Sequence, residues 1–209
     1  MWIRASRTVR PLFHLRTPGT LRPMASGPTA SRPWFAFSLD LAPTTASPHL
    51  HVLPPVPDFP EGDLAEALDV DVVYDVHVPN WGGRVARLVD APGHRILGRL
   101  RSVAAESWPA LARLETALAL ATEERPVKVR TASGAVVAAH AFTPSAQGAS
   151  PQGPVSEAFL ITLAVAAERA HLPADVVEKL QAEARIVHAV QHARPDGHLP
   201  PTPSKSGIK

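Results

Sequence analysis

The 209-residue sequence contains no cysteine. This absence excludes a disulfide scaffold, a zinc site built from thiolates and a cysteine nucleophile. No apolar run approaches the roughly 18 residues that a membrane-spanning helix needs, and the GxGxxG, P-loop, GxSxG and HExxH motifs are all missing. The composition therefore predicts a protein without a membrane-spanning helix and without these nucleotide-binding or hydrolase motifs. A reducing cytoplasm is the expected compartment.

Acidic side chains are absent from residues 1–33, which carry six arginines. Residues 34–192 hold 12 basic and 18 acidic side chains, so this middle part has a net charge of −6. The Arg-, Ser- and Pro-rich composition of residues 1–33 favours a disordered leader, or a protein that truly starts at Met24. Both interpretations are favoured over a targeting peptide. Residues 193–209 are expected to be a disordered, Pro-rich tail. The acidic middle argues against specific nucleic-acid binding.

The middle part has the periodicities of folded structure. Apolar and polar residues alternate over 70–78, which predicts a half-buried strand. Strands are also expected at 34–41, 84–89, 94–103, 127–131 and 135–142. Helices are expected at 62–68, after Ser107 as N-cap, from Ser156 to Pro173 and from Pro173 to His192, and surface loops at 42–60 and 143–155.

The order of these elements indicates a fold class. The turn-forming sequence at 90–93 is expected to join 84–89 and 94–103 in a hairpin, and a second hairpin is expected between 127–131 and 135–142. Strands outnumber helices early in the chain, and helices dominate late. We therefore predict an α+β domain over 34–192 with a small, mixed but mostly antiparallel sheet that can close into a β-barrel, flanked by helices.

Glu115 is the first candidate for chemistry. It lies beside Leu114 at the edge of a helix face formed by Leu111, Leu114 and Leu118. A carboxylate at this position would be desolvated, which raises its pKa and suits a general base near neutral pH. Spacing alone favours the alternative, an ordinary helical glutamate that faces water.

Two further candidates are weaker. The turn after the first strand can expose backbone N–H groups that hold a carboxylate or phosphate, although a plain strand end is the simpler interpretation. His188 and His192 are four residues apart on the last helix and could bind a metal. No acidic residue accompanies them at Glu-x-x-His spacing, so we expect solvent-facing histidines and no metal site. The same holds for His49 and His51.

Five segments, in order over 34–185, resemble the gamma-glutamylcyclotransferases. Trp34-Phe-Ala-Phe-Ser-Leu-Asp-Leu41 is similar to the Tyr-Phe-Ala-Tyr-Gly-Ser-Asn-Leu opening of that family. The other four are the glycine pair, strand and Pro-Gly turn of 81–100, the helix segment 108–115, the strand 125–130 and the closing helices of 156–180.

The resemblance implies a small mixed barrel flanked by helices and a small-molecule gamma-glutamyl substrate. The family cyclises gamma-glutamyl amines or peptides, releasing 5-oxoproline and the amine, without a metal or organic cofactor. Glu115 matches the general acid/base of that reaction. The loop that would hold the substrate's α-carboxylate comprises Phe37, Ser38, Leu39, Asp40 and Leu41.

Several residues depart from the family pattern. Tyr-Gly-Ser-Asn is replaced by Phe37-Ser-Leu-Asp40, Thr116 replaces a glycine, and a tyrosine expected near 122 is absent. Asp40 places a negative charge where an α-carboxylate would dock, and two such charges ~4 Å apart repel by about 4 kcal/mol at an effective dielectric constant near 20. Three functions stay open: a cyclotransferase of altered specificity, a catalytically impaired ligand- or protein-binding module, and an interaction protein that acts through its basic and Pro-rich ends.

Overall fold

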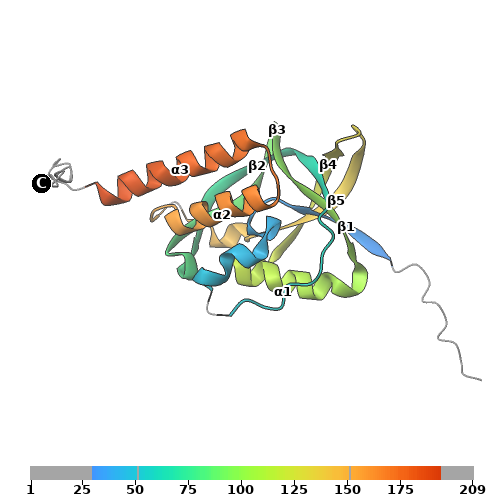
Figure 1. The fold of residues 1–209 in the computed structure, drawn as a ribbon, viewed down its shortest axis with the longest axis horizontal. Helices are drawn as coiled ribbons and strands as arrows, with labels where there is room; N and C mark the ends of the chain where they lie inside the picture. Colours follow the sequence, from blue (N-terminus) through green and yellow to red (C-terminus); the bar gives the residue numbers. More distant parts are fainter. Residues whose placement is uncertain (1–29, 51, 151, 194–209) are drawn as a thin grey trace, which may run out of the picture.

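The computed structural model describes residues 30–50, 52–150 and 152–193. The expected tail lies almost entirely outside these residues, as does the leader up to residue 29, including Met24. The elements are β1 Ser31–Ala36, β2 Asp63–Val78, β3 Gly83–Ala104, α1 Trp108–Ala119, β4 Glu123–Thr131, β5 Val136–Thr143, α2 Glu157–Arg169 and α3 Ala174–His192, together with short 3-10 turns (Figure 1). β1 thus begins three residues before the expected start of the domain.

The five strands form a closed barrel in the order β1-β3-β2-β4-β5. β1 pairs in parallel with β5, where Trp34 lies opposite His140, and the other pairs are antiparallel. The predicted α+β class with a mixed, mostly antiparallel barrel is confirmed. Alternate strand residues, most of them small or β-branched, fill the barrel interior together with Phe37, which follows β1, as the narrow space requires: Phe35, Phe37, Ala65, Ala67, Val70, Leu88, Val127, Val129, Ala139 and Ala141.

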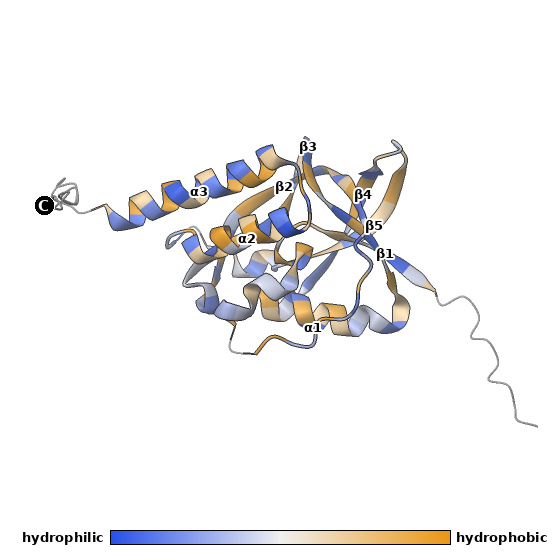
Figure 2. Ribbon diagram, viewed as in Figure 1, coloured by the Kyte–Doolittle hydropathy of each residue, from blue (hydrophilic) through white to orange (hydrophobic). Residues whose placement is uncertain are grey.

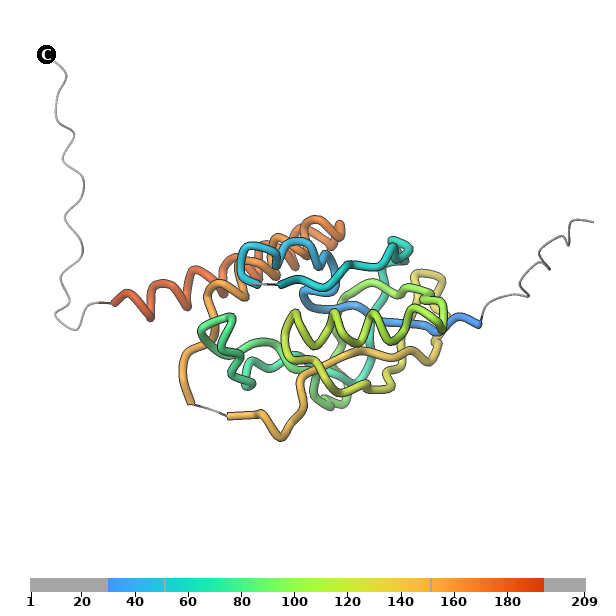
Figure 3. Tube along the Cα trace, turned by 90° about the horizontal axis from the view of Figure 1, so that it is seen from below, coloured from blue at the N-terminus to red at the C-terminus, as the bar shows by residue number. Residues whose placement is uncertain are grey.

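A second apolar cluster lies between the barrel and the helices. The predicted stripe of Leu111, Leu114 and Leu118 is buried in it, each side chain at most 1% exposed. The two closing helices begin and end close to the predicted residues. Figures 1 and 3 both show the last turns of α3 extending beyond the barrel, and in Figure 2 hydrophobic and hydrophilic residues are mixed along that part. Within the described residues, no helix is both long and apolar enough to cross a membrane.

Two predicted elements are wrong. Residues 62–68 are not a helix but the start of β2, because Ala65 and Ala67 alternate into the barrel interior and tertiary pairing overrides helix propensity. The hairpin between 84–89 and 94–103 is also wrong, since both segments belong to β3 and both pair with β2. The turn-forming residues 91–94 bulge opposite Asp69, whose Oδ1 accepts a hydrogen bond from Gly93 N at 3.0 Å.

The first strand and the following loop also differ from the prediction. β1 ends at Ala36, and the chain then makes a 3-10 turn over Leu39–Leu41. The expected surface loop 42–60 starts with a 3-10 segment, Pro43–His49, and contributes to the apolar cluster. Phe59 from this loop packs edge-on against Trp34, with ring centroids 5.0 Å apart. The loop therefore covers the outside of the barrel next to the turn.

Candidate active site

The turn after β1 is held against the barrel by its own backbone and by one arginine. Leu41 N donates to Ser38 O at 3.0 Å and closes the turn. Arg101, on the neighbouring strand β3, donates to the carbonyl oxygens of Asp40 at 3.1 Å and of Leu41 at 2.8 Å. The guanidinium of Arg101 thus holds the loop 37–41 in place through two of its backbone carbonyls.

Asp40 turns its carboxylate back onto this loop. Its Oδ1 accepts hydrogen bonds from Ser38 N at 2.6 Å and from Phe37 N at 3.2 Å, and the side chain is 1% exposed. Two backbone donors of the predicted carboxylate-binding loop are therefore occupied by a carboxylate of the chain itself.

Glu115 faces Asp40 from α1. It is 4% exposed, so the alternative of a glutamate that faces water is wrong. Burial raises the pKa of Glu115 well above its ordinary value, and the neighbouring Asp40 carboxyl raises it further. Glu115 and Asp40, 75 residues apart in sequence, thus form one buried carboxyl pair beside Arg101.

Burial also raises the pKa of Asp40, from 3.8 to about 6, against the opposing effects of the Ser38 amide, Arg101, the Phe37 amide and Glu115. Each carboxyl acts on the other in opposite directions, raising the pKa of Glu115 and lowering that of Asp40, so the proton of the pair belongs on Glu115. Asp40 Oδ2 and Glu115 Oε1 are buried and have no hydrogen-bonding partner among the described residues. Near neutral pH the pair holds one acid and one carboxylate, which suits the transfer of a single proton.

The space next to the carboxyl pair is small. A cavity of about 10 Å³ touches Asp40, Glu115 and Phe37, which is about the space that one water molecule requires. A second, larger hollow of about 460 Å³ lies between strands β2 and β3 and helices α2 and α3, and it shares Phe37 and Ala86 with the small cavity. The larger hollow has the size of a small-molecule site.

The larger hollow has an apolar floor and an acidic rim. Phe37, Leu41 and several aliphatic side chains of α2 and α3 form the floor, and the charged lining residues are Glu66, Asp71, Asp175, Glu183, Arg95 and Lys179. Tyr74 Oη donates to Glu183 Oε2 at 3.4 Å. Burial and the neighbouring Glu183 raise the pKa of Tyr74 above its ordinary value of 10.0, so the phenol stays protonated.

Of the candidates predicted from the sequence, Glu115 and the loop 37–41 lie in one site, and the histidines lie elsewhere. The structure brings Glu115 and the loop 37–41 together, with Leu39 buried in the apolar cluster and Leu41 on the wall of the larger hollow. His49 stacks on Trp81 with centroids 5.0 Å apart, and His51 lies outside the described residues. His188 and His192 lie on α3, apart from the carboxyl pair.

Arg101 and Tyr74 were not recognised from the sequence. Arg101 is one of five arginines in β3, the longest strand of the barrel, and no local pattern distinguishes the buried one from the others. Tyr74 is the single tyrosine of the chain and lies in the alternating pattern of β2. This alternation predicts that its side chain is partly buried, but it does not predict that the side chain lines a hollow. Both act through partners that are distant in sequence.

No protein-family model matches the sequence, and no curated protein matches it significantly. Solved structures do match. A gamma-glutamyl cyclotransferase aligns with 73% of this chain and 88% of its own at 19% identity, with a TM-score of 0.57. An uncharacterised human protein, loc79017, aligns with 73% of this chain and 87% of its own at 20% identity and a TM-score of 0.55.

A yeast gamma-glutamyl cyclotransferase specific to glutathione aligns with 79% of this chain and 99% of its own, at 12% identity and a TM-score of 0.50. At identities this low, the similarity establishes the architecture. The resemblance found in the sequence is therefore confirmed at the level of structure: the chain has the gamma-glutamyl cyclotransferase fold.

Proposed function

We propose that the chain catalyses cyclotransferase-type acid–base chemistry on a gamma-glutamyl amine, with Glu115 as the general acid/base. The observation that carries this proposal is the buried Glu115 carboxyl, which faces the loop 37–41 and has a strongly raised pKa. Perturbed carboxyls in such positions are typical of catalytic groups. The fold is that of enzymes with this chemistry.

The proposed reaction needs one proton to move. The α-amine of the substrate attacks the γ-carbonyl carbon, the new C–N bond closes the five-membered lactam, and the C–N bond to the leaving amine breaks. The α-amine loses a proton and the leaving nitrogen gains one. A pair with one acid and one carboxylate can supply and accept these protons, because the attack is intramolecular and needs little beyond orientation.

Charge in and around the site selects the substrate. Asp40 repels a second carboxylate and already occupies two backbone donors, so a substrate whose α-carboxyl is masked as an amide is favoured over one with a charged α-carboxylate. The rim of the larger hollow carries four acidic and two basic side chains. A leaving amine that carries a positive charge therefore fits this hollow. Phe37 lines both the small cavity and the larger hollow, so we expect its side chain to turn aside when a substrate reaches Glu115.

The test incubates the full chain with gamma-glutamyl amines and dipeptides, each with a free or an amidated α-carboxyl, and measures the release of 5-oxoproline or its amide. Wild type is expected to release the lactam, and Glu115→Gln to reduce the rate at least 100-fold, the range for loss of a general acid or base. Glu106→Gln, at an exposed glutamate just before α1, serves as the control and should match wild type. Equal background release by all three proteins would overturn the proposal.

A second function is favoured by the small volume at Glu115. A cavity of about 10 Å³ holds no gamma-glutamyl group, and this supports a catalytically impaired member of the fold that binds a cationic, partly apolar ligand in the larger hollow. Such a protein would release no lactam from any substrate of the panel. It would bind an alkyl diamine in calorimetry, and Glu183→Gln would weaken that binding, whereas Glu178→Gln, at an exposed position on the same helix, would not.

A further inference from the structure

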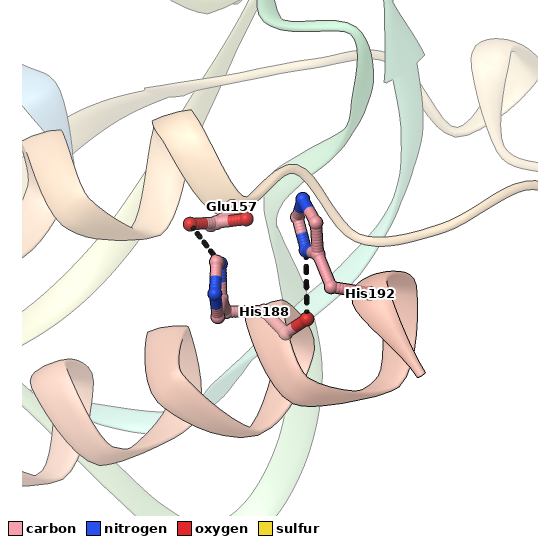
Figure 4. Close-up of side chains that lie close together, drawn as sticks. All are labelled: Glu157, His188 and His192. Carbon is pink, nitrogen blue, oxygen red and sulfur yellow. Dashed lines mark hydrogen bonds and ion pairs between the residues drawn. The ribbon is translucent and has the colours of Figure 1, made fainter. Parts of the chain in front are cut away.

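Three side chains that can bind a metal meet between α2 and α3, away from the carboxyl pair. Glu157 is the first residue of α2, and His188 and His192 lie one turn apart near the end of α3 (Figure 4). One ligand atom from each side chain lies within 4.8 Å of the other two. Glu157 is 31 residues from His188 in the sequence, so the spacing of the histidines gave no sign of this third group.

The hydrogen bonds of the two imidazoles indicate which nitrogen of each ring can bind a metal. His192 Nδ1 lies 2.9 Å from the backbone carbonyl oxygen of His188. A carbonyl oxygen only accepts, so Nδ1 of His192 carries the proton and Nε2 keeps its lone pair. His188 Nδ1 lies 2.9 Å from Glu157 Oε1, so Nδ1 is the nitrogen of His188 that could share an ion with this carboxylate, and the ion would replace the present contact. Metal-binding histidines commonly have their second nitrogen fixed by a carbonyl oxygen, as His192 Nδ1 is here.

We propose that Glu157, His188 and His192 form a binding site for a divalent transition metal ion of the zinc or nickel class. Two imidazoles and one carboxylate are a ligand set used for zinc, and imidazoles also suit nickel and copper. Bonds of about 2.0–2.1 Å place tetrahedral ligand atoms about 3.4 Å apart, so no two of the ligand atoms need to approach each other by more than ~1.4 Å. They can do so by rotation, because the His188 side chain is 57% exposed and His192 is exposed too.

The ion would add a link between the start of α2 and the end of α3. The last turns of α3 extend beyond the barrel (Figure 1), and Gln191 Nε2 contributes one further tie by donating to Val155 O at 2.9 Å. Glu157 also borders two surface hollows of about 360 and 340 Å³. With three protein ligands, the fourth position of a tetrahedral ion stays open to water or to an external anion in these hollows.

The test uses the full chain, stripped with a chelator, and zinc, nickel or cobalt chloride alone. Calorimetry is expected to show one ion per chain, cobalt to develop the visible absorption of a tetrahedral site, and the melting temperature to rise with zinc. Glu157→Gln is expected to weaken binding at least tenfold, and His188→Ala with His192→Ala to abolish it. His77→Ala, at an exposed histidine of β2, should bind like wild type.

The variants must share the melting temperature of wild type without metal, which separates loss of a ligand from loss of the fold. The proposal is overturned if wild type binds no ion, or if the double histidine variant binds zinc as tightly as wild type. It is also overturned if His198→Ala alone removes the binding, because the ion would then belong to the chain beyond the described residues.

Discussion

Replacing Asp40 by asparagine tests the carboxyl pair through stability. The asparagine side chain has the same shape, and its amide oxygen can still accept the hydrogen bonds that Phe37 N and Ser38 N donate to Asp40 Oδ1. The substitution therefore removes the buried charge and keeps the turn. The amide nitrogen of the new side chain can in addition donate to Glu115.

The sign and size of the effect follow from the pKa of Asp40. Because this pKa is raised from 3.8 to about 6 on folding, the folded protein binds more protons than the unfolded chain between these values. The stabilisation is complete below pH 3.8 and is lost as the pH rises through about 6. The shift corresponds to about 3 kcal/mol, an upper limit because the group is coupled to Glu115. Asp40→Asn is therefore expected to raise the free energy of unfolding by up to about 3 kcal/mol at about pH 8 but by only about 1 kcal/mol at about pH 4.5.

The assay is denaturant unfolding of both proteins at constant ionic strength between about pH 4.5 and 8.5. Asp40→Ala is the control, because it removes the charge together with the acceptor. It leaves two buried N–H groups without their partner, at about 1–3 kcal/mol each, and should lack the net gain of the asparagine variant. The reasoning is refuted if Asp40→Asn is less stable than wild type at pH 8, or if the difference between the two proteins does not change with pH.

Three further predictions concern the surroundings of the pair. Arg101→Met leaves the carbonyls of Asp40 and Leu41 without their donor, so we expect a loss of about 2–4 kcal/mol, measured by the same denaturant unfolding. Gly98→Ala would place a Cβ 2.6 Å from the Phe35 ring and should destabilise by about 1–3 kcal/mol in thermal unfolding. The phenol of Tyr74 should ionise only above its ordinary pKa of 10.0 in an ultraviolet titration; ionisation below that value would contradict its burial beside Glu183.

The sequence predicted the parts of the fold that local periodicity determines. The alternation over 70–78 and the leucine stripe of α1 are each set by one buried face. Ser156 marks the start of α2 because its Oγ accepts a hydrogen bond from Phe159 N at 3.0 Å. The helix predicted over 62–68 and the hairpin turn predicted at 90–93 are wrong. In both places the local residue pattern is overridden by pairing with strands that are distant in sequence. A bulge and a hairpin turn use the same residues, and only the partner strand distinguishes them.

The candidate site was predictable only in outline. The placement of Glu115 and the loop 37–41 followed from motifs, and the charge of Asp40 was recognised as a conflict with a bound α-carboxylate. The return of that carboxylate onto Phe37 N and Ser38 N could not be read from the sequence, because it depends on the dihedral angles of the turn. Arg101 and Glu157 were missed for a related reason: each meets its partners through the tertiary fold.

The charge of Asp40 is difficult to explain by structure alone. An asparagine would accept the same two hydrogen bonds without the destabilisation that a buried carboxylate causes at neutral pH. Asp40 also raises the pKa of Glu115, so its charge acts on the group that we propose as the acid/base. A residue that lowers stability at neutral pH while perturbing a buried glutamate has the signature of a functional site. Asp40→Asn should consequently lower the pKa of Glu115 and move any Glu115-dependent lactam release to lower pH. An unchanged pH profile in an active variant would separate Asp40 from the chemistry and leave it as a residue of the turn.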